Sequence, residues 1–182
     1  MIRRSLLRDV GAQGRDAWVS AALEVLSTQG VEGVRVELLA RRLKITKGSF
    51  YHHFKDRDDL HAAMLQHWRR RLVVDVIEEL ERVADPHERF RELMRVSYDV
   101  ARVDRDIDLA IMLWARQDRR AAAALEDADR MRTDFIGRTL IACGVPHREA
   151  VARAVLTLAF LRAAPALDEE QFTACERLLI KP

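Results

Sequence analysis

The chain has 182 residues, of which 49% are hydrophobic and 33% are charged, a composition typical of folded globular proteins and unlike that of disordered or membrane-embedded ones. Its seven glycines and four prolines are too few for a sheet protein with many tight turns, and its two cysteines, Cys143 and Cys175, are too few for a disulfide scaffold. The net charge of +2 is unevenly distributed, because residues 1–55 carry 10 basic and 5 acidic groups while the rest carry 21 and 24. A basic first third on an acidic body favours an anionic partner, although a short segment can also reach this balance by chance.

The start of the chain is expected to be a flexible basic arm over residues 1–13. It lacks the apolar core of a signal peptide, because Arg8 and Asp9 interrupt the short apolar stretch. The longest strongly apolar run, Ala154 to Leu161, is far below the roughly 18 residues that a membrane-spanning helix needs. We therefore expect a cytoplasmic protein that does not associate with membranes.

Three helices are predicted at the beginning of the folded part. The first, over residues 15–29, places its apolar side chains along one stripe and is followed by a glycine that favours a helix end. The second covers residues 36–43, and the third covers residues 47–53. Thr46 is predicted to cap the third helix, with its hydroxyl accepting a hydrogen bond from the Ser49 amide. Two short helices joined by such a turn form a helix-turn-helix motif.

Six further helices follow, and acidic residues at Asp56, Asp85 and Asp168 mark three of their starts. Their predicted ranges are residues 57–83, 86–103, 107–115, 119–143, 146–164 and 169–179. The count is nine helices with no convincing strand. The sequence therefore predicts an all-α fold with a helix-turn-helix head and a longer helical body.

The third helix carries the chemistry of the head. Phe50 and Phe54 face inward and anchor it, which leaves a set of polar groups to face a partner. These are Thr46, Lys47, Gly48, Ser49, Tyr51, His52 and Lys55. Gly48 costs about 1 kcal/mol relative to alanine inside a helix, which makes sense if a DNA strand comes close. A cation, hydroxyls, a phenol and an imidazole at the start of the second motif helix suit double-stranded DNA; the alternative is an ordinary solvated helix face.

The segment from Leu39 to Asp56, preceded by Gly30 and Gly33, resembles the DNA-binding head of the tetracycline-repressor (TetR) family of transcriptional regulators. The resemblance covers residues 14–65. It implies an Ω-shaped homodimer of nine-helix chains, with a DNA-binding domain over residues 14–56 and a ligand-binding and dimerisation domain over residues 57–182. It also implies that the third helix enters the major groove of a near-palindromic operator, with Tyr51 and Lys55 at phosphate-contacting positions.

Two positions depart from the family pattern. Val36 stands where a threonine usually caps the second helix, and Lys44 stands where the turn usually has glycine. Lys44 must therefore adopt an unfavourable backbone conformation or reshape the turn. These departures leave open an alternative function, a helical ligand-sequestering or protein-interaction module whose head has lost DNA binding. The first hypothesis is a repressor that a small-molecule effector releases from its operator.

Bulky side chains in the body are candidates for binding this effector, whose chemistry the sequence does not specify. They are Trp68, Met94, Tyr98, Trp114, Met131 and Phe135. Such side chains could line a cavity between the fourth to seventh helices, although aromatic and methionine residues at helical spacing more often form plain core.

The helix over residues 146–164 is apolar nearly all round, so it must bury two faces. Together with the last helix, it is predicted to form an isologous homodimer interface. The predicted interface residues are Val151, Ala154, Val155, Leu158, Leu161, Phe172 and Leu178. The alternative is a fully internal helix in a monomer.

Sequence motifs of enzymes and metal sites give no signal. No histidine and cysteine spacing resembles a zinc or iron site, and no phosphate loop or nucleophile elbow is present. We therefore predict no catalytic residues, no metal and no cofactor.

Overall fold

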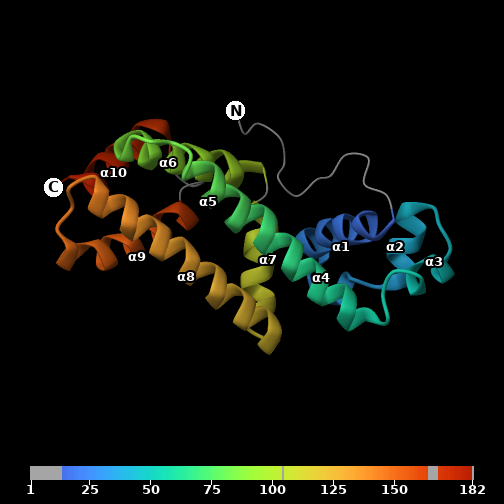
Figure 1. Ribbon diagram of the computed structural model, residues 1–182. Helices are drawn as coiled ribbons and strands as arrows, with labels where there is room; N and C mark the ends of the chain where they lie inside the picture. Colours follow the sequence, from blue (N-terminus) through green and yellow to red (C-terminus); the bar gives the residue numbers. More distant parts are fainter. Residues whose placement is uncertain (1–13, 104, 164–167, 182) are drawn as a thin grey trace. The chain divides into compact units, whose positions relative to one another are not determined.

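The computed structural model describes residues 14–103, 105–163 and 168–181, and within these ranges it contains helices and no strands (Figure 1). The elements are α1 (Arg15–Gln29), the 3₁₀ turn η1 (Val31–Gly33), α2 (Val36–Leu43), α3 (Lys47–Tyr51), α4 (Arg57–Arg69), the π segment η2 (Arg70–Val74), α5 (Asp75–Leu80), α6 (Pro86–Val103), α7 (Arg105–Ala115), α8 (Arg119–Ala142), α9 (His147–Ala163) and α10 (Glu169–Ile180). Since α4, η2 and α5 follow one another without a break, these residues form nine separate helices. The all-α prediction is confirmed. No described helix is both long and apolar enough to cross a membrane.

Local capping explains why several helices begin where the sequence predicted. The side chains of Asp56 and Asp85 each accept a hydrogen bond from the backbone amide three residues further on, over 2.8 Å and 2.7 Å. Asp168 and Gln171 form a complete capping box at the start of α10, in which each side chain bonds the backbone of the other. These bonds satisfy amides that the first helical turn leaves without intrahelical partners.

Two details of the helix-turn-helix differ from the prediction. Thr46 precedes α3, but its hydroxyl makes no capping bond; the Ser49 amide instead donates to the Thr46 carbonyl over 3.1 Å. The main chain thus satisfies this amide and leaves the Thr46 side chain exposed. Val36 is the first residue of α2 rather than its cap, and the cap position is held by Arg35, whose side chain makes no capping bond.

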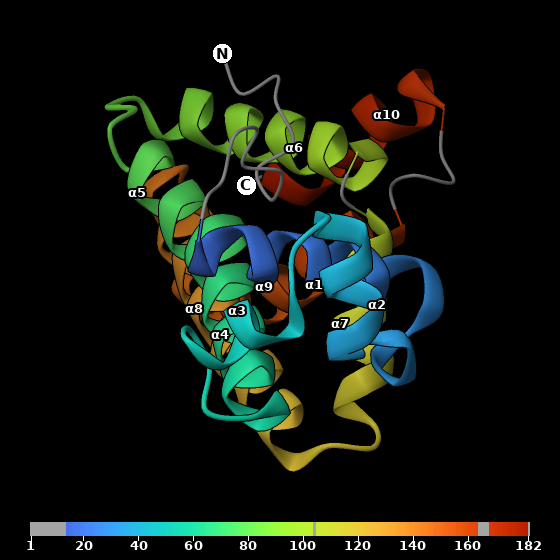
Figure 2. The same cartoon turned by 90° about the vertical axis from the view of Figure 1, so that its right-hand side faces the viewer.

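The described residues fall into two compact units. The head unit comprises residues 14–72 and 105–126, and the body unit comprises residues 73–103, 127–163 and 168–181. In the head unit α1 packs against α2, α4 and α7, and α2 packs against α3, so that α2 and α3 lie beside each other (Figure 2). In the body unit α6 packs against α5 and α9.

Aromatic packing holds α3 in the head unit. Phe50 is fully buried, and its ring meets that of Trp18 edge to face at 5.2 Å and stacks on that of Phe54, also at 5.2 Å. Such aromatic pairs contribute about 0.5–1.5 kcal/mol each beyond the burial of their area. The predicted anchoring role of Phe50 and Phe54 is confirmed.

The body unit has its own apolar core. Leu80 of α5, Phe90 and Met94 of α6, Phe135 of α8 and Leu158 of α9 are among its members, and each is at least nine-tenths buried. The body unit is thus built around one continuous cluster of buried side chains from five helices. The fifth helix is α10, which contributes Phe172.

Lys44 ends α2 in the left-handed conformation, with φ 57° and ψ 39°. It is the one residue other than glycine with a positive φ in the part of the chain that the structure describes. The Ile45 amide bonds the Ala40 carbonyl over 3.0 Å, and this bond closes the helix end around the left-handed residue. The turn is therefore kept, and lysine takes the unfavourable conformation that the sequence implied.

Replacement of Lys44 by glycine should relieve this conformation. A left-handed residue with a Cβ costs about 1–2 kcal/mol, and the greater freedom of glycine in the unfolded chain offsets part of the gain. We expect Lys44→Gly to raise the free energy of unfolding by roughly 0.5–1 kcal/mol, measured by urea denaturation. Lys44→Ala removes the same charge but keeps the Cβ, so an equal gain in that variant would contradict the conformational explanation.

Candidate nucleic-acid interface

The predicted recognition residues gather on α3 and the turn that follows it. Thr46, Lys47, Gly48, His52 and Lys55 are exposed and Ser49 is half-buried. Tyr51 is 66% exposed, although its ring also meets that of Phe50 edge to face at 5.2 Å. Since the buried Phe50 fixes the opposite side of the same helix, α3 presents these polar groups from a firmly packed position.

Gly48 is not required by the packing of its own chain. A Cβ built at Gly48 would find only the Thr46 hydroxyl oxygen, at 3.7 Å, which is an ordinary contact distance. By contrast, a Cβ at Gly33 would lie 2.6 Å from that of Gln29, so Gly33 is sterically required. The helix-weakening glycine in α3 thus suits the close approach of something outside the chain.

The cations around α3 differ in their surroundings. The Lys47 Nζ lies 2.8 Å from Oε1 of Glu37 on α2. The Lys55 side chain is exposed, and within residues 14–103, 105–163 and 168–181 no ion pair to it is found. Hydrogen bonding by Lys47 holds the pKa of Glu37 below its ordinary value, so the Glu37 carboxylate is ionised at neutral pH. The sequence pattern did not predict Glu37 as a partner of Lys47, because ten residues and a turn separate the two positions.

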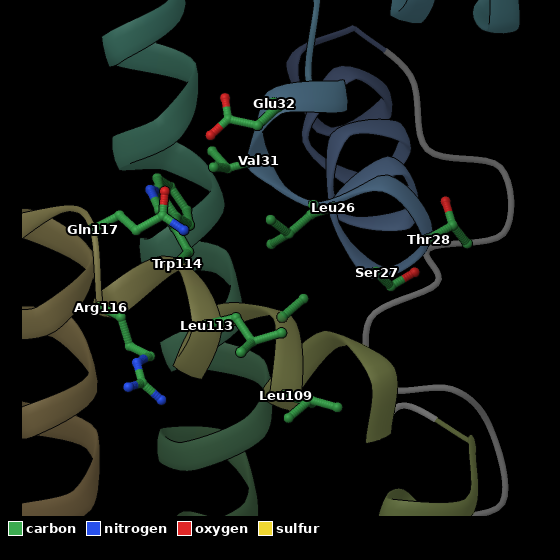
Figure 3. Close-up of a pocket in the computed structure, with 12 residues that line it drawn as sticks. Leu26, Ser27, Thr28, Val31, Glu32, Leu109, Leu113, Trp114, Arg116 and Gln117 are labelled. Carbon is green, nitrogen blue, oxygen red and sulfur yellow. The ribbon is translucent and has the colours of Figure 1, made fainter.

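A groove lies within the head unit between the end of α1 and α7, with a volume of about 780 Å³ (Figure 3). Figure 3 shows Leu26 of α1 and Leu113 of α7 beside it, with Arg116 and Gln117 extending from the turn after α7. Among the six predicted effector-binding residues, Trp114 is the one that lines this groove. Sequence reasoning missed the groove because it depends on the packing of two helices about 80 residues apart.

The other predicted effector-binding residues are distributed over both units. Trp68 is fully buried in the head unit, where its indole NH donates to the Asp108 carboxylate over 3.0 Å. Met94 and Phe135 belong to the core of the body unit. Tyr98 is half-buried against the Phe172 ring, at a centroid distance of 4.7 Å. Met131, on α8, is also half-buried.

The predicted dimer residues separate into two sets. Ala154, Leu158, Leu161 and Phe172 are packed into the core of their own body unit and are at most 9% exposed. Val151, Val155 and Leu178 are 72%, 54% and 71% exposed in the single chain. Leu156, which was not predicted, is 60% exposed on α9 as well. Fewer of the predicted α9 residues are therefore available to a second copy than the sequence pattern suggested, because Ala154, Leu158 and Leu161 are buried in their own chain.

His61 of α4 is buried against α7, with only 4% of its surface exposed. Its ring meets that of Trp114 edge to face at 5.0 Å, and its Nε2 finds no hydrogen-bond partner among the described residues. Burial lowers the pKa of His61, and the positive charges of Arg57 and Arg120 act in the same direction. The neutral imidazole is therefore the form that this packing accommodates.

Among the described residues, no group of three or more histidine, cysteine or acidic side chains is placed to hold a metal ion. Cys143 is buried, and burial raises the pKa of its thiol, which makes it a poor nucleophile at neutral pH.

Comparison with known proteins bears first on the head. Residues 19–64 match the family model described as bacterial regulatory proteins, tetR family. The HTH-type transcriptional regulator BetI of Rhizobium meliloti is 29% identical over 100 residues, which are 55% of this chain and 48% of that protein. The HTH-type transcriptional regulator SAB2452 of Staphylococcus aureus is 28% identical over 93 residues, 51% of this chain and 48% of that protein. The chain thus spans about half the length of the curated relatives it matches.

Solved structures extend the likeness of fold to nearly the whole chain. A transcriptional regulator from Rhodococcus sp. Rha1 superposes with a TM-score of 0.73 at 22% identity, covering 92% of this chain and 94% of that one. A transcriptional regulator of the TerR/AcrR family from Aquifex aeolicus VF5 gives a TM-score of 0.64 at 18% identity, with coverages of 93% and 96%. At these identities the likeness concerns the fold alone.

Acidification should weaken the head unit through His61. The unfolded chain takes up a proton near the ordinary histidine pKa of 6.5, whereas the folded chain resists protonation, so stability is complete above that pH and falls as the pH drops below it. We expect His61→Leu to flatten the decline in the free energy of unfolding between pH 7.5 and 5.5, measured by urea denaturation.

The exposed histidine His147 supplies the control, because His147→Ala should leave the slope of this decline unchanged. A His61→Leu variant that declines as steeply as the unsubstituted protein would show that other groups cause the loss.

Proposed function

We propose that the chain is a transcriptional regulator of the tetR family, whose model residues 19–64 match, and that its α3 enters the major groove of double-stranded DNA. The observation that carries the proposal is α3 itself: a five-residue helix, fixed from beneath by Phe50, that turns its polar side chains to solvent. The role of these side chains in binding is part of the proposal.

The individual contacts follow from the chemistry of each group. Lys55 and the Tyr51 hydroxyl suit phosphate oxygens, while Thr46, Ser49 and His52 offer donors and acceptors for base edges. Gly48 allows the DNA backbone to approach the start of α3. The residues around α3 provide binding chemistry, and the proposal does not include an enzymatic activity.

Repression and release by an effector complete the proposed function, in a cytoplasmic homodimer on a near-palindromic operator. A bound small molecule would favour a conformation in which the two heads no longer match successive major grooves, about 34–36 Å apart. The candidates for effector contacts are Trp68 and Trp114 within the head unit and, separately, Met94, Tyr98, Met131 and Phe135 within the body unit.

The proposed homodimer uses the exposed apolar strip of α9 together with Leu178 of α10. Val151, Val155 and Leu156 are each more than half exposed, and a strip of this kind is stabilised when a second copy covers it. Ala154, Leu158, Leu161 and Phe172 would support the strip from beneath, since they are buried in their own chain.

The alternative, a module without DNA binding, is not favoured. Its support came from Val36 and Lys44, yet the left-handed Lys44 closes the turn between α2 and α3 and keeps the two helices together.

Selection of bound duplexes from a random 30-base-pair library tests the proposal directly. Enrichment of a near-palindromic sequence, followed by binding of that sequence well above a scrambled duplex at moderate salt, is the expected result. Failure to enrich any sequence, together with equal binding of scrambled DNA, would overturn it.

Replacement of Lys55 should remove one phosphate contact. We expect Lys55→Ala to weaken binding to the selected duplex and to reduce the slope of log affinity against log salt by about one, measured by fluorescence anisotropy over a salt titration. Lys181→Ala removes a lysine from outside the head and should leave the slope unchanged. An unchanged slope in Lys55→Ala would remove Lys55 from the interface.

Placing a charge on the α9 strip should prevent association of two copies. We expect Val155→Glu to shift the protein from dimer to monomer in multi-angle light scattering, because a carboxylate in an apolar interface is strongly disfavoured. Leu113→Glu, at a similarly exposed apolar position on α7, should remain dimeric. A dimeric Val155→Glu protein would place the interface elsewhere.

A further inference from the structure

Lys47, the first residue of α3, already forms an ion pair in the free protein. Its Nζ lies 2.8 Å from Oε1 of Glu37, within hydrogen-bond distance, and the pair joins the first turn of α3 to the first turn of α2. Both side chains are more than half exposed, at 58% and 55%. The pair therefore lies at the surface that the proposed DNA contact would cover, rather than in the core.

The Glu37 carboxylate has reasons to stay ionised and in place. It lies in the first turn of α2, where the helix dipole favours a negative charge. The Lys47 hydrogen bond, and more weakly the charge of Arg35, hold its pKa below the ordinary value. A phosphate approaching Lys47 must therefore compete with a carboxylate that is always charged at neutral pH.

This competition affects the two kinds of DNA contact differently. Sequence-independent binding depends on cations that are free to neutralise phosphates, and a cation already neutralised by a carboxylate contributes little to it. A lysine ammonium has three donors, however, so Lys47 can keep its bond to Glu37 and still donate to an acceptor on a base edge. The N7 and O6 atoms of guanine are the acceptors that lysine reads in the major groove.

We propose that Glu37 is a specificity-determining residue of the DNA interface, whose carboxylate withholds Lys47 from phosphates and directs its ammonium to a guanine edge. The inference rests on the proposed DNA-binding function. Glu37 touches no DNA in this account and acts through the position of Lys47. Lys47 differs in this respect from Lys55, whose exposed ammonium would contribute its charge directly to phosphate binding.

The test compares Glu37→Gln, Lys47→Ala and the double variant on two duplexes, the selected operator and a scrambled sequence of the same length. We expect Glu37→Gln to bind the scrambled duplex roughly 3–10 times more tightly and to steepen its salt slope by about one, because the freed Lys47 then neutralises a phosphate. The selected duplex should gain less, so discrimination between the two falls. In the Lys47→Ala background, Glu37→Gln should change neither quantity.

A second readout locates the effect on the DNA. Repeated selection with Glu37→Gln should relax the preference for guanine at one position of each half-site, and Lys47→Ala should relax the same position. A purely structural role for Glu37 would lower stability without moving the preferred base, and thermal unfolding followed by circular dichroism separates the two.

Glu24→Gln is the matched control, because Glu24 forms a similar exposed pair with Arg42 over 2.6 Å and its replacement changes the charge of the head by the same amount. We expect no change in discrimination from it. If Glu37→Gln tightens binding equally with and without Lys47, Glu37 acts only as a general negative charge and the inference is wrong. If the unsubstituted protein selects no sequence, the proposed function fails instead, so the two failures are distinguishable.

Discussion

The burial of Phe50 is the interaction on which the candidate interface depends. A helix of five residues is too short to be stable in water, because the cost of forming the first turn exceeds what its few hydrogen bonds return. α3 exists because Phe50 is enclosed by the Trp18 and Phe54 rings. Since the opposite side of the helix is held in this way, Lys47, Ser49 and Tyr51 are presented at fixed positions, and their own side chains contribute little to the folding of the motif.

The neighbours of each polar residue near α3 determine which kind of DNA contact that residue suits. In the proposed interface, Lys55 suits a phosphate because it is exposed and has no ion pair among the described residues. Lys47 is bound by Glu37 and suits a directed contact. A similar separation is seen on α9, where Leu158 completes the core and Val155, only three residues earlier, remains exposed. In both places two side chains of the same chemical kind are suited to different roles, because their neighbours in the fold differ.

The parts of the fold that depend on local chemistry were predictable from the sequence. Asp56, Asp85 and Asp168 mark helix starts because a capping bond needs only a residue three positions away. The predicted side-chain cap at Thr46 was wrong, because the Ser49 amide had two possible acceptors on Thr46, the hydroxyl and the carbonyl. Only the carbonyl is used. Other features depend on packing between separate helices, which periodicity along one chain does not encode. They are the Glu37 partner of Lys47, the choice of the inward side of α9, and the groove between α1 and α7.

The left-handed Lys44 also has a meaning for how this surface is maintained. Glycine would adopt the same conformation without steric cost, so a lysine there gives up stability at a position where the simplest substitution would restore it. What lysine adds is an exposed positive charge at the turn directly before α3. Replacing this lysine by glycine would therefore relax the backbone and remove the charge beside α3 in the same step.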